Sequence, residues 1–404
     1  MTQASIQQHI TPGTQALGHP QDLYELAPEV QTPTFRHMDQ LYPTRSVPRG
    51  ATVYPLQCGK SIAPTYALSD EAGAPQWDAE AFMRRNDVTG LLVLKGDAIV
   101  LEKYAHGNDE NTRWTSFSVA KSISSTLVAA ALQDGAIASL QDAVVKYVPA
   151  LKGSGYDGVT VEQVLNMCSG VRWDETYRNP QSDRRAMFSA QLSLQRGSIL
   201  QVLRGLPRLH APGTVFNYST GESFLQSEIV SAATGMSAAS YLAQKIWQPM
   251  GMEQDAYWQL DAPDGMEIAS SGFCAILRDY GRFGRFIAQG GRIQGQQVLP
   301  AGWVDGMNAL PANSMLRGVK PYAGQHALGY QHQWWLFPQG DQAVAGHGSS
   351  AFSAIGVFGQ YLYINRAADV VTVLWSSAPA PEMPAYETEI VAFLAAAVSA
   401  CAAV

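Results

Sequence analysis

A serine and a lysine three residues apart are the side chains of this chain best suited to act together in catalysis. Ser118 and Lys121 lie in the stretch from Trp114 to Ser125, which predicts the start of a buried helix. Positions i and i+3 share one face of a helix, so the amine of Lys121 can reach the hydroxyl of Ser118. An unprotonated lysine is a base, and a serine beside a base is a candidate nucleophile.

Two features distinguish this pair from a chance match on a solvated helix face. No other lysine of the chain has a serine three residues before it. The flanking residues are apolar and place Lys121 in a core, where it must be paired or lose its proton; they are Phe117, Val119, Ala120, Ile123, Leu127 and Val128. The first turn of the helix also offers free backbone N–H groups to a developing oxyanion.

A tyrosine is the best candidate for a proton shuttle. Tyr218 lies in the loop 213–221, just ahead of a predicted helix. A tyrosine beside the lysine would form a coupled pair whose proton can serve the leaving group; the alternative is a packed tyrosine with a satisfied hydroxyl. Gly-x-Ser-x-Gly, His-Glu-x-x-His and the phosphate-binding Gly-x-x-x-x-Gly-Lys are absent, so a nucleophile elbow, a zinc-protease site and a P-loop are unsupported. His347, in a glycine-rich turn, is either a site residue or a structural imidazole.

Size and charge restrict the class of protein. The 404 residues are enough for one large or two intimate domains. The net charge of -7 and the lack of a basic stripe argue against a nucleic-acid partner. Four widely spaced cysteines without metal-ligand spacing predict reduced thiols, with no metal and no cofactor; they are Cys58, Cys168, Cys274 and Cys401.

The N-terminal segment carries no targeting signal in its composition. Residues 1–40 are polar and proline-containing and lack an apolar core of signal-peptide type. No apolar run reaches membrane-spanning length. We therefore expect no membrane association and, by default, a cytoplasmic location.

The order of predicted elements indicates an α/β (α+β) body with a helical insertion. Residues 1–75 are expected to be an irregular arm, 89–104 a hairpin, and the Ser118 helix to reach about residue 134. Further helices are expected at 159–167, 221–234, 240–247, 276–289 and 387–398, and strands at 328–337, 351–357, 361–365 and 370–375. We predict three parts: an arm at 1–85 packed on the body, an α/β domain at 86–121 with 246–404, and an α-rich domain at 122–245.

Three motifs in this order resemble the serine β-lactamase and penicillin-binding superfamily. They are Ser118-Val-Ala-Lys121, Tyr218-Ser-Thr220 and the segment 354–364. More narrowly, the chain is similar to class C β-lactamase-like esterases and to 6-aminohexanoate-dimer hydrolases, from about residue 85 to the C-terminus. The resemblance implies the β-lactamase/transpeptidase-like fold, an antiparallel sheet flanked by helices.

The resemblance also implies roles for individual residues. Ser118 would be acylated, Lys121 and Tyr218 would share the general base and acid work, and the N–H groups of Ser118 and Val357 would hold the oxyanion. Substrate would be bound by residues around this centre, namely Tyr177, Trp173, Gly356, Trp334 and His347. Glu175 or Asp183 would meet a substrate ammonium or, alternatively, be exposed loop residues, while Trp334 and Trp335 would divide between lining the pocket and packing the sheet.

Two departures from the penicillin-recognising relatives favour other substrates. Thr220 stands where they usually have Asn, and the strand matching their Lys-Thr-Gly reads Ala354-Ile355-Gly356, without a cation. A β-lactam carboxylate would lose a charge-assisted hydrogen bond worth roughly 1.5–3 kcal/mol. We expect an acyl-enzyme hydrolase of small esters or linear amides. The alternatives are a β-lactamase or D-Ala-D-Ala carboxypeptidase and a non-catalytic sensor on the same fold; a homodimer is left open.

Overall fold

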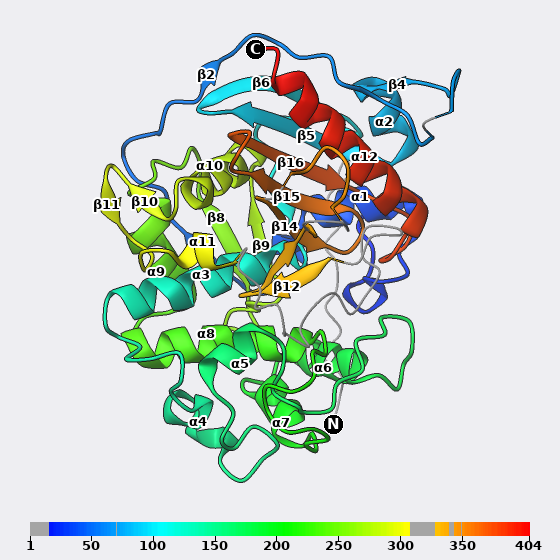
Figure 1. Cartoon of the computed structure of the whole chain (residues 1–404). Coiled ribbons are helices and arrows are strands. Elements are labelled where there is room, and N and C mark those ends of the chain that lie inside the picture. Colours follow the sequence, from blue (N-terminus) through cyan, green and yellow to red (C-terminus); the bar gives the residue numbers. More distant parts are fainter. Residues whose placement is uncertain (1–15, 70, 308–327, 339–342, 349) are drawn as a thin grey trace.

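A large antiparallel sheet forms the centre of the molecule (Figure 1). The structure, a computed structural model, describes residues 16–69, 71–307, 328–338, 343–348 and 350–404. In spatial order the strands are β12 (Gly329–Gln331), β13 (Trp334–Leu336), β14 (Ala351–Gly356), β15 (Gln360–Asn365), β16 (Val370–Ser376), β5 (Val88–Lys95), β6 (Ala98–Tyr104) and β2 (Gln57–Cys58). Every pair is antiparallel except β2 with β6.

Successive side chains of a strand point to opposite faces of the sheet, and both faces are buried because a helix covers each face. Leu92 and Val371 belong to the core beneath α10 (Leu277–Ala288), while Leu91 and Val370 belong to the core beneath α12 (Pro384–Cys401). The helix α10 approaches the strands closely at Gly281, where an added Cβ would lie 2.7 Å from Leu92. Burial on both faces explains why these strands read as continuous apolar runs.

A second, smaller sheet positions the nucleophile candidate. Its order is β1 (Thr44–Val47), β8 (Ala256–Gln259), β9 (Phe273–Ala275) and β7 (Trp114–Thr115). Directly after β7, the backbone N–H and the hydroxyl of Ser116 both donate to the carbonyl of Phe273, each at 3.0 Å. These bonds fix the turn from β7 into α3 (Val119–Gln133), the helix that Ser118 precedes.

Most of the helices between β7 and β8 lie together on one side of the sheet, and α9 (Ala238–Leu242) lies apart from most of them, beside α3 (Figure 1). The others after α3 are α4 (Val144–Tyr147), α5 (Val161–Leu165), α6 (Asp183–Leu192), α7 (Ser198–Arg204) and α8 (Thr220–Thr234). The longest of them, α8, packs against the buried helix α3. A capping box between Thr160 and Gln163 begins α5.

The N-terminal arm is more regular than its proline content predicts. Residues 28–36 form the helix α1 (Pro28–Arg36), so the expectation of an irregular segment is wrong there. Pro28 occupies the first helical turn, where the missing N–H costs nothing, and Phe35 anchors the helix in the core. Residues 1–15 of the predicted arm lie outside the described residues. Short elements complete the chain: α2 (Ala79–Arg85), α11 (Trp303–Met307), β3 (Thr65–Tyr66), β4 (Trp77–Asp78), β10 (Arg292–Ile293) and β11 (Gln296–Gln297).

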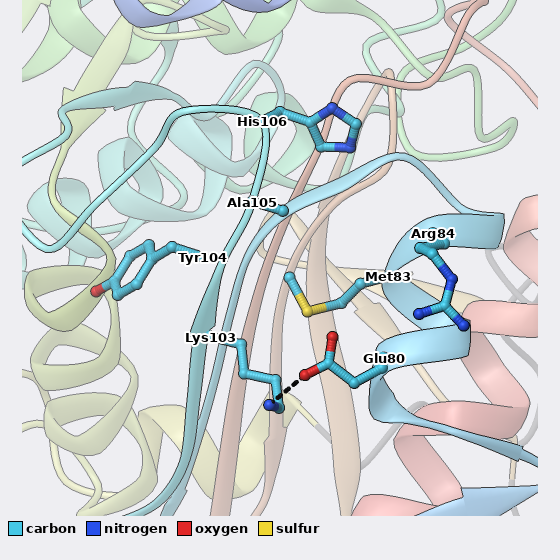
Figure 2. Close-up of a pocket in the computed structure, with 7 residues that line it drawn as sticks. All are labelled: Glu80, Met83, Arg84, Lys103, Tyr104, Ala105 and His106. Carbon is cyan, nitrogen blue, oxygen red and sulfur yellow. Dashed lines mark hydrogen bonds and ion pairs between the residues drawn. The ribbon is translucent and has the colours of Figure 1, made fainter.

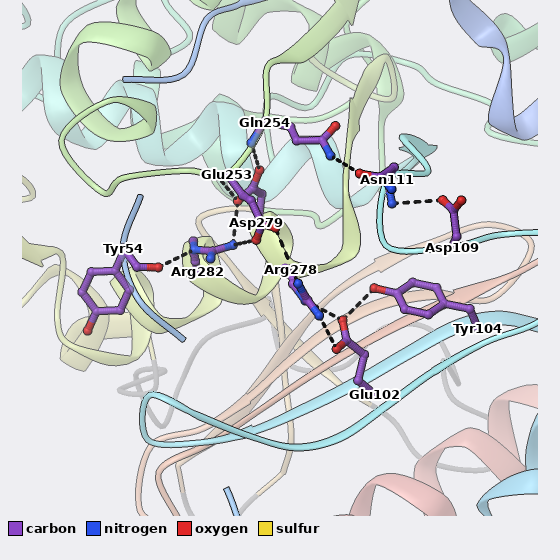
Figure 3. A network of polar contacts seen from close by, with 10 residues as sticks. All are labelled: Tyr54, Glu102, Tyr104, Asp109, Asn111, Glu253, Gln254, Arg278, Asp279 and Arg282. Carbon is purple, nitrogen blue, oxygen red and sulfur yellow. Dashed lines mark hydrogen bonds and ion pairs between the residues drawn. The ribbon is translucent and has the colours of Figure 1, made fainter. Parts of the chain in front are cut away.

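A polar network ties α10 to the sheet and to the arm (Figure 3). Arg278 donates two hydrogen bonds to Glu102 on β6, at 2.8 and 2.9 Å. One turn on, Arg282 donates to the carbonyl of Tyr54 at 3.0 Å and to the buried Asp279. Burial raises the pKa of Asp279 to about 6 despite the N–H groups and the guanidinium beside it. The network fixes the position of α10 on the sheet.

The fold agrees with the antiparallel sheet and flanking helices expected from the sequence. The four cysteines are free, with Cys58 exposed and the others buried. None of the helices in the described part of the chain combines the length and apolar character needed to span a bilayer. In the same residues, no group of His, Cys, Asp and Glu side chains is arranged to hold a metal ion. The three-part division stays a proposal.

Candidate active site

The first turn of α3 presents Ser118 in a constrained geometry. Ser118 precedes the helix and Phe117 before it has a φ of +44°, in the left-handed region. A bulky residue rarely adopts such a φ, and it persists when the surroundings fix it. The side chain of Ser118 is largely buried. A strained turn of this kind is a common way to aim a nucleophile.

The amine of Lys121 contacts Ser118 as the i, i+3 spacing predicts. Its Nζ lies 2.9 Å from the Oγ of Ser118, 3.1 Å from the Oγ1 of Thr220 and 2.8 Å from the carbonyl oxygen of Ser270. Burial lowers the pKa of Lys121 to about 7; Glu175 opposes this shift and Arg184 adds to it. At neutral pH a substantial fraction of Lys121 is therefore an unprotonated base within reach of the Ser118 hydroxyl.

Glu175 determines which way the lysine points its lone pair. It accepts hydrogen bonds from the backbone N–H of Thr220, at 2.9 Å, and from the Thr220 hydroxyl. Because the Thr220 proton is used on Glu175, the Thr220 oxygen accepts an N–H from Lys121, and the carbonyl of Ser270 accepts the other. A neutral amine has two N–H groups and one lone pair, so the lone pair is left for the proton of Ser118.

Tyr218 stays protonated. Its hydroxyl oxygen is buried and has no hydrogen-bond partner in the part of the chain that the structure describes. Burial first, and Glu175 second, raise the pKa of Tyr218, and the neighbouring Ser118 hydroxyl opposes that rise. The Lys121 amine lies 5.2 Å from the centre of the Tyr218 ring. Tyr218 is thus suited to give a proton to a leaving group rather than to take one from Ser118.

Two backbone N–H groups are available near Ser118 for an oxyanion. The end of β14 presses against the turn before α3, since a Cβ on Gly356 would lie 2.5 Å from the Ser116 carbonyl oxygen and 3.0 Å from the Ser118 nitrogen. Among the described residues, the N–H groups of Ser118 and Val357 take part in no hydrogen bond of a turn or loop. An oxyanion hole needs two free donors of this kind side by side.

A cavity of about 560 Å³ opens beside Tyr218. It is lined by the loop of Trp173, Glu175 and Tyr177 and by the segment of Pro381 and Glu382. The indole of Trp173 and the hydroxyl of Tyr177 both donate to Glu175, at 2.5 and 3.1 Å. This volume suits a small organic substrate, and both predicted loop residues, Trp173 and Tyr177, line it.

Other candidate residues lie elsewhere. Trp334 is buried against Phe352, and Trp335 instead stacks on the Tyr218 ring at 5.5 Å. The ring of His347 contacts the Tyr363 hydroxyl, at 2.9 Å, and the Val391 carbonyl, at 3.2 Å, beneath α12. Neither Trp334 nor His347 is among the described residues that line the cavity.

The two loop carboxylates also differ from expectation. Asp183 is bonded to Arg172 at 2.8 Å and to the N–H of Asp174 at 3.0 Å. Neither it nor Glu175 is an exposed loop residue, and the contact of one of them with a substrate ammonium stays a prediction. Sequence reasoning missed the contact of Glu175 with Thr220. The available signal was a carboxylate placed two residues from each of two aromatic residues, Trp173 and Tyr177.

A second pocket, of about 190 Å³, lies between α2 and β6 (Figure 2). Lys103 and Glu80 form an ion pair at its edge, at 2.6 Å. Four strand spacings separate β6 from β14 in the sheet, or roughly 20 Å. It shares no described lining residue with the cavity beside Tyr218.

The fold and this site define a protein of the serine β-lactamase class. Residues 79–397 match the model of the Beta-lactamase family, and the chain belongs to that family. It is a serine hydrolase of the β-lactamase fold.

Two relatives are similar over most of their length. The 6-aminohexanoate-dimer hydrolase of Paenarthrobacter ureafaciens is 28% identical over 355 residues, which are 86% of each chain. A solved structure from Bacillus anthracis, provisionally assigned as a 6-aminohexanoate-dimer hydrolase, aligns with a TM-score of 0.78 and 23% identity over 92% of this chain and 93% of that one.

A more distant structure shares the fold alone. A family VIII carboxylesterase aligns with a TM-score of 0.58 and 15% identity over 78% of this chain and 95% of the other. The fold therefore occurs both in a structure described as a 6-aminohexanoate-dimer hydrolase and in a carboxylesterase.

Proposed function

We propose that this protein hydrolyses small esters or linear amides through an acyl-enzyme on Ser118. The observation that carries the proposal is the 2.9 Å contact between the Lys121 amine and the Ser118 hydroxyl, made by a lysine whose burial lowers its pKa to about 7. A base that lies beside a serine and has a pKa near the working pH supports nucleophilic catalysis. The relatives named for 6-aminohexanoate-dimer hydrolysis support a linear amide as one substrate class.

The reaction begins with proton transfer from Ser118 to Lys121. The Ser118 oxygen attacks the substrate carbonyl carbon, and the oxyanion lies between the N–H groups of Ser118 and Val357. Tyr218 gives its proton to the leaving alcohol or amine as the carbonyl–leaving-group bond breaks, and it is reprotonated from Lys121. Water then attacks the acyl-enzyme by the same steps in reverse and releases the acid.

The end of β14 disfavours substrates that carry a carboxylate beside the scissile bond. Ala354 and Ile355 are buried and apolar, where penicillin-recognising enzymes supply a cation. A β-lactamase or D-Ala-D-Ala carboxypeptidase activity is therefore the weaker alternative. A non-catalytic sensor is weaker still, because the serine, lysine and tyrosine are all present at the site.

Labelling with a fluorophosphonate probe tests the nucleophile directly. Intact mass should show a single adduct on the wild type and none on Ser118→Ala. Initial rates on p-nitrophenyl acetate, p-nitrophenyl butyrate, nitrocefin and the linear dimer of 6-aminohexanoate then separate esterase, amidase and lactamase. A wild type that is neither labelled nor active, or a Ser118→Ala variant that keeps its activity, would reject the proposal.

A further inference from the structure

A helix of the N-terminal arm packs directly beneath the residues that flank the two proposed oxyanion donors. Phe35, near the end of α1, is fully buried. The centre of its ring lies 4.9 Å from that of Phe117 and 5.0 Å from that of Phe358. Figure 1 shows α1 as the dark blue helix close to the sheet. The arm thus touches the active site although it lies before residue 79, where the family match begins.

The two residues that Phe35 contacts are both in unfavourable backbone conformations. Phe117 has a φ of +44° and Phe358 has a φ of +63°, and their rings lie 5.1 Å apart. Phe117 directly precedes Ser118, and Phe358 directly follows Val357. Bulky residues keep a left-handed φ only where packing over-determines it. The N–H of Ser118 belongs to the peptide that joins it to Phe117, and the carbonyl of Val357 belongs to the peptide that joins it to Phe358. The backbone conformations of the two phenylalanines therefore constrain the directions of the Ser118 and Val357 N–H groups.

Hydrogen bonds also tie α1 to the segment that carries Phe358. The Gln31 amide donates to the carbonyl oxygens of Ser377, at 3.0 Å, and Ala378, at 2.7 Å. Ala378 in turn donates its N–H to the Phe358 carbonyl at 3.3 Å, and Phe358 donates to the carbonyl of Pro381 at 3.0 Å. Gln31 is itself buried. The helix therefore holds Phe358 from two directions, by ring packing and through this chain of hydrogen bonds.

We infer that α1 is a positioning element of the oxyanion hole. Phe35 packs against Phe117 and Phe358 and so holds the N–H groups of Ser118 and Val357 in the directions that an oxyanion requires. The inference rests on the proposed function. Phe35 does not touch substrate and is a positioning residue. Its loss would let the two strained backbones relax, and small displacements of oxyanion donors are costly to the rate.

Phe35→Ala and Phe35→Leu test the positioning role of Phe35. The measurements are kcat and KM on p-nitrophenyl butyrate, the inhibition constant of a phenylboronic acid that forms a tetrahedral adduct with Ser118, and the thermal midpoint. We expect kcat to fall about 10- to 100-fold in Phe35→Ala, with KM within about twofold, and the boronic acid to bind more weakly by a similar factor. Phe35→Leu, which keeps most of the volume, should recover much of both losses.

A matched control separates positioning from stability. Phe82 is as buried as Phe35 and stacks on Phe393, at 3.9 Å, in the core beneath α12. Phe82→Leu should lower the thermal midpoint at least as much as Phe35→Leu and leave kcat and boronic acid affinity unchanged at 25 °C. A folded Phe35→Ala with wild-type kcat, or a kcat loss without weaker boronic acid binding, would overturn the inference. Loss of labelling in Ser118→Ala tests the proposed function separately.

Discussion

Glu175 accepts two hydrogen bonds from Thr220, one from the backbone N–H of Thr220 at 2.9 Å and one from the Thr220 hydroxyl. This pair fixes the direction of the Thr220 hydroxyl proton and, through it, the lone pair of Lys121. Thr220 therefore does more than occupy the position where many relatives have an asparagine. With Glu175 behind it, Thr220 constrains the amine of Lys121.

The variant Glu175→Gln should lower kcat about 10- to 100-fold. Oε2 of Glu175 accepts two N–H groups, from Thr220 and from the Trp173 indole, so the glutamine must keep its carbonyl there. Its NH₂ would then face the Thr220 hydroxyl, whose proton would turn toward the Lys121 lone pair. Steady-state kinetics on p-nitrophenyl butyrate measure the loss. Asp174→Asn, which changes a charge in the same cavity wall, is the control and should keep at least half the wild-type kcat; a Glu175→Gln enzyme at wild-type rate contradicts this role.

The pH profile should report the protonation of Lys121. The base must be neutral, so kcat/KM should rise tenfold per pH unit below about 7 and level off above it, following the lowered pKa of Lys121. Burial raises the pKa of Tyr218, so the rate should not fall again up to pH 9.5. In Glu175→Gln the acid limb should move to lower pH, since Glu175 raises the pKa of Lys121. A limb near pH 10 in the wild type would mean that the lysine is charged at rest.

Gly356→Ala should inactivate the enzyme without unfolding it. The added methyl would meet the Ser116 carbonyl oxygen and the Ser118 nitrogen at 2.5 and 3.0 Å, which pushes β14 away from the nucleophile. We expect a loss of kcat of about 100-fold or more, with the far-UV spectrum unchanged. Gly205→Ala is a suitable control, because its methyl would find no neighbour nearer than 3.5 Å. Equal activities of the two variants would show that a methyl group fits at position 356 without displacing β14.

Glu222→Gln should stabilise the protein at alkaline pH. Burial raises the pKa of Glu222 to about 8, above its value of about 4.5 in the unfolded chain. The stability that this group contributes is therefore full below about pH 4.5 and is lost as the pH rises through 8. Glutamine can still accept the Ser169 hydroxyl, which bonds to Oε1 at 2.5 Å, but cannot ionise.

Urea unfolding at pH 5 and pH 8.5 measures the effect of Glu222→Gln. The variant should gain roughly 3–5 kcal/mol relative to the wild type between the two values. Glu80→Gln, at an exposed ion pair, should show less than about 1 kcal/mol of such change. A gain that does not depend on pH would point to packing instead of ionisation.

Much of the candidate site could be predicted from local sequence, because its parts are local. The Ser118–Lys121 contact follows from helix geometry alone, and the hairpin of β5 and β6 and the helices α3, α8 and α10 lie close to their expected ranges. The family match and the fold confirm the superfamily suggested by the three motifs.

Contacts between distant segments could not be predicted. Glu175 meets Thr220 across 45 residues, and although the aromatic residues on either side of Glu175 indicate burial, they do not reveal its partner. The helix α1 was missed because its prolines resemble those of a coil, while its stability comes from Phe35 in a distant core. His347 was a plausible site residue in a turn, but its ring lies beneath α12, an arrangement that depends on tertiary packing.

The pairing of β5 with β16 sets when this protein can become active during its synthesis. Lys95 pairs with Val370, so the middle of the sheet joins two strands about 275 residues apart. The hairpin of β5 and β6 leaves the ribosome early, with one apolar edge uncovered until β16 has emerged. An uncovered strand edge of this kind is an aggregation risk. Val357 is also synthesised late, shortly before β16. The nascent chain therefore cannot complete the central sheet, or the proposed site at the end of β14, before β16 has been synthesised.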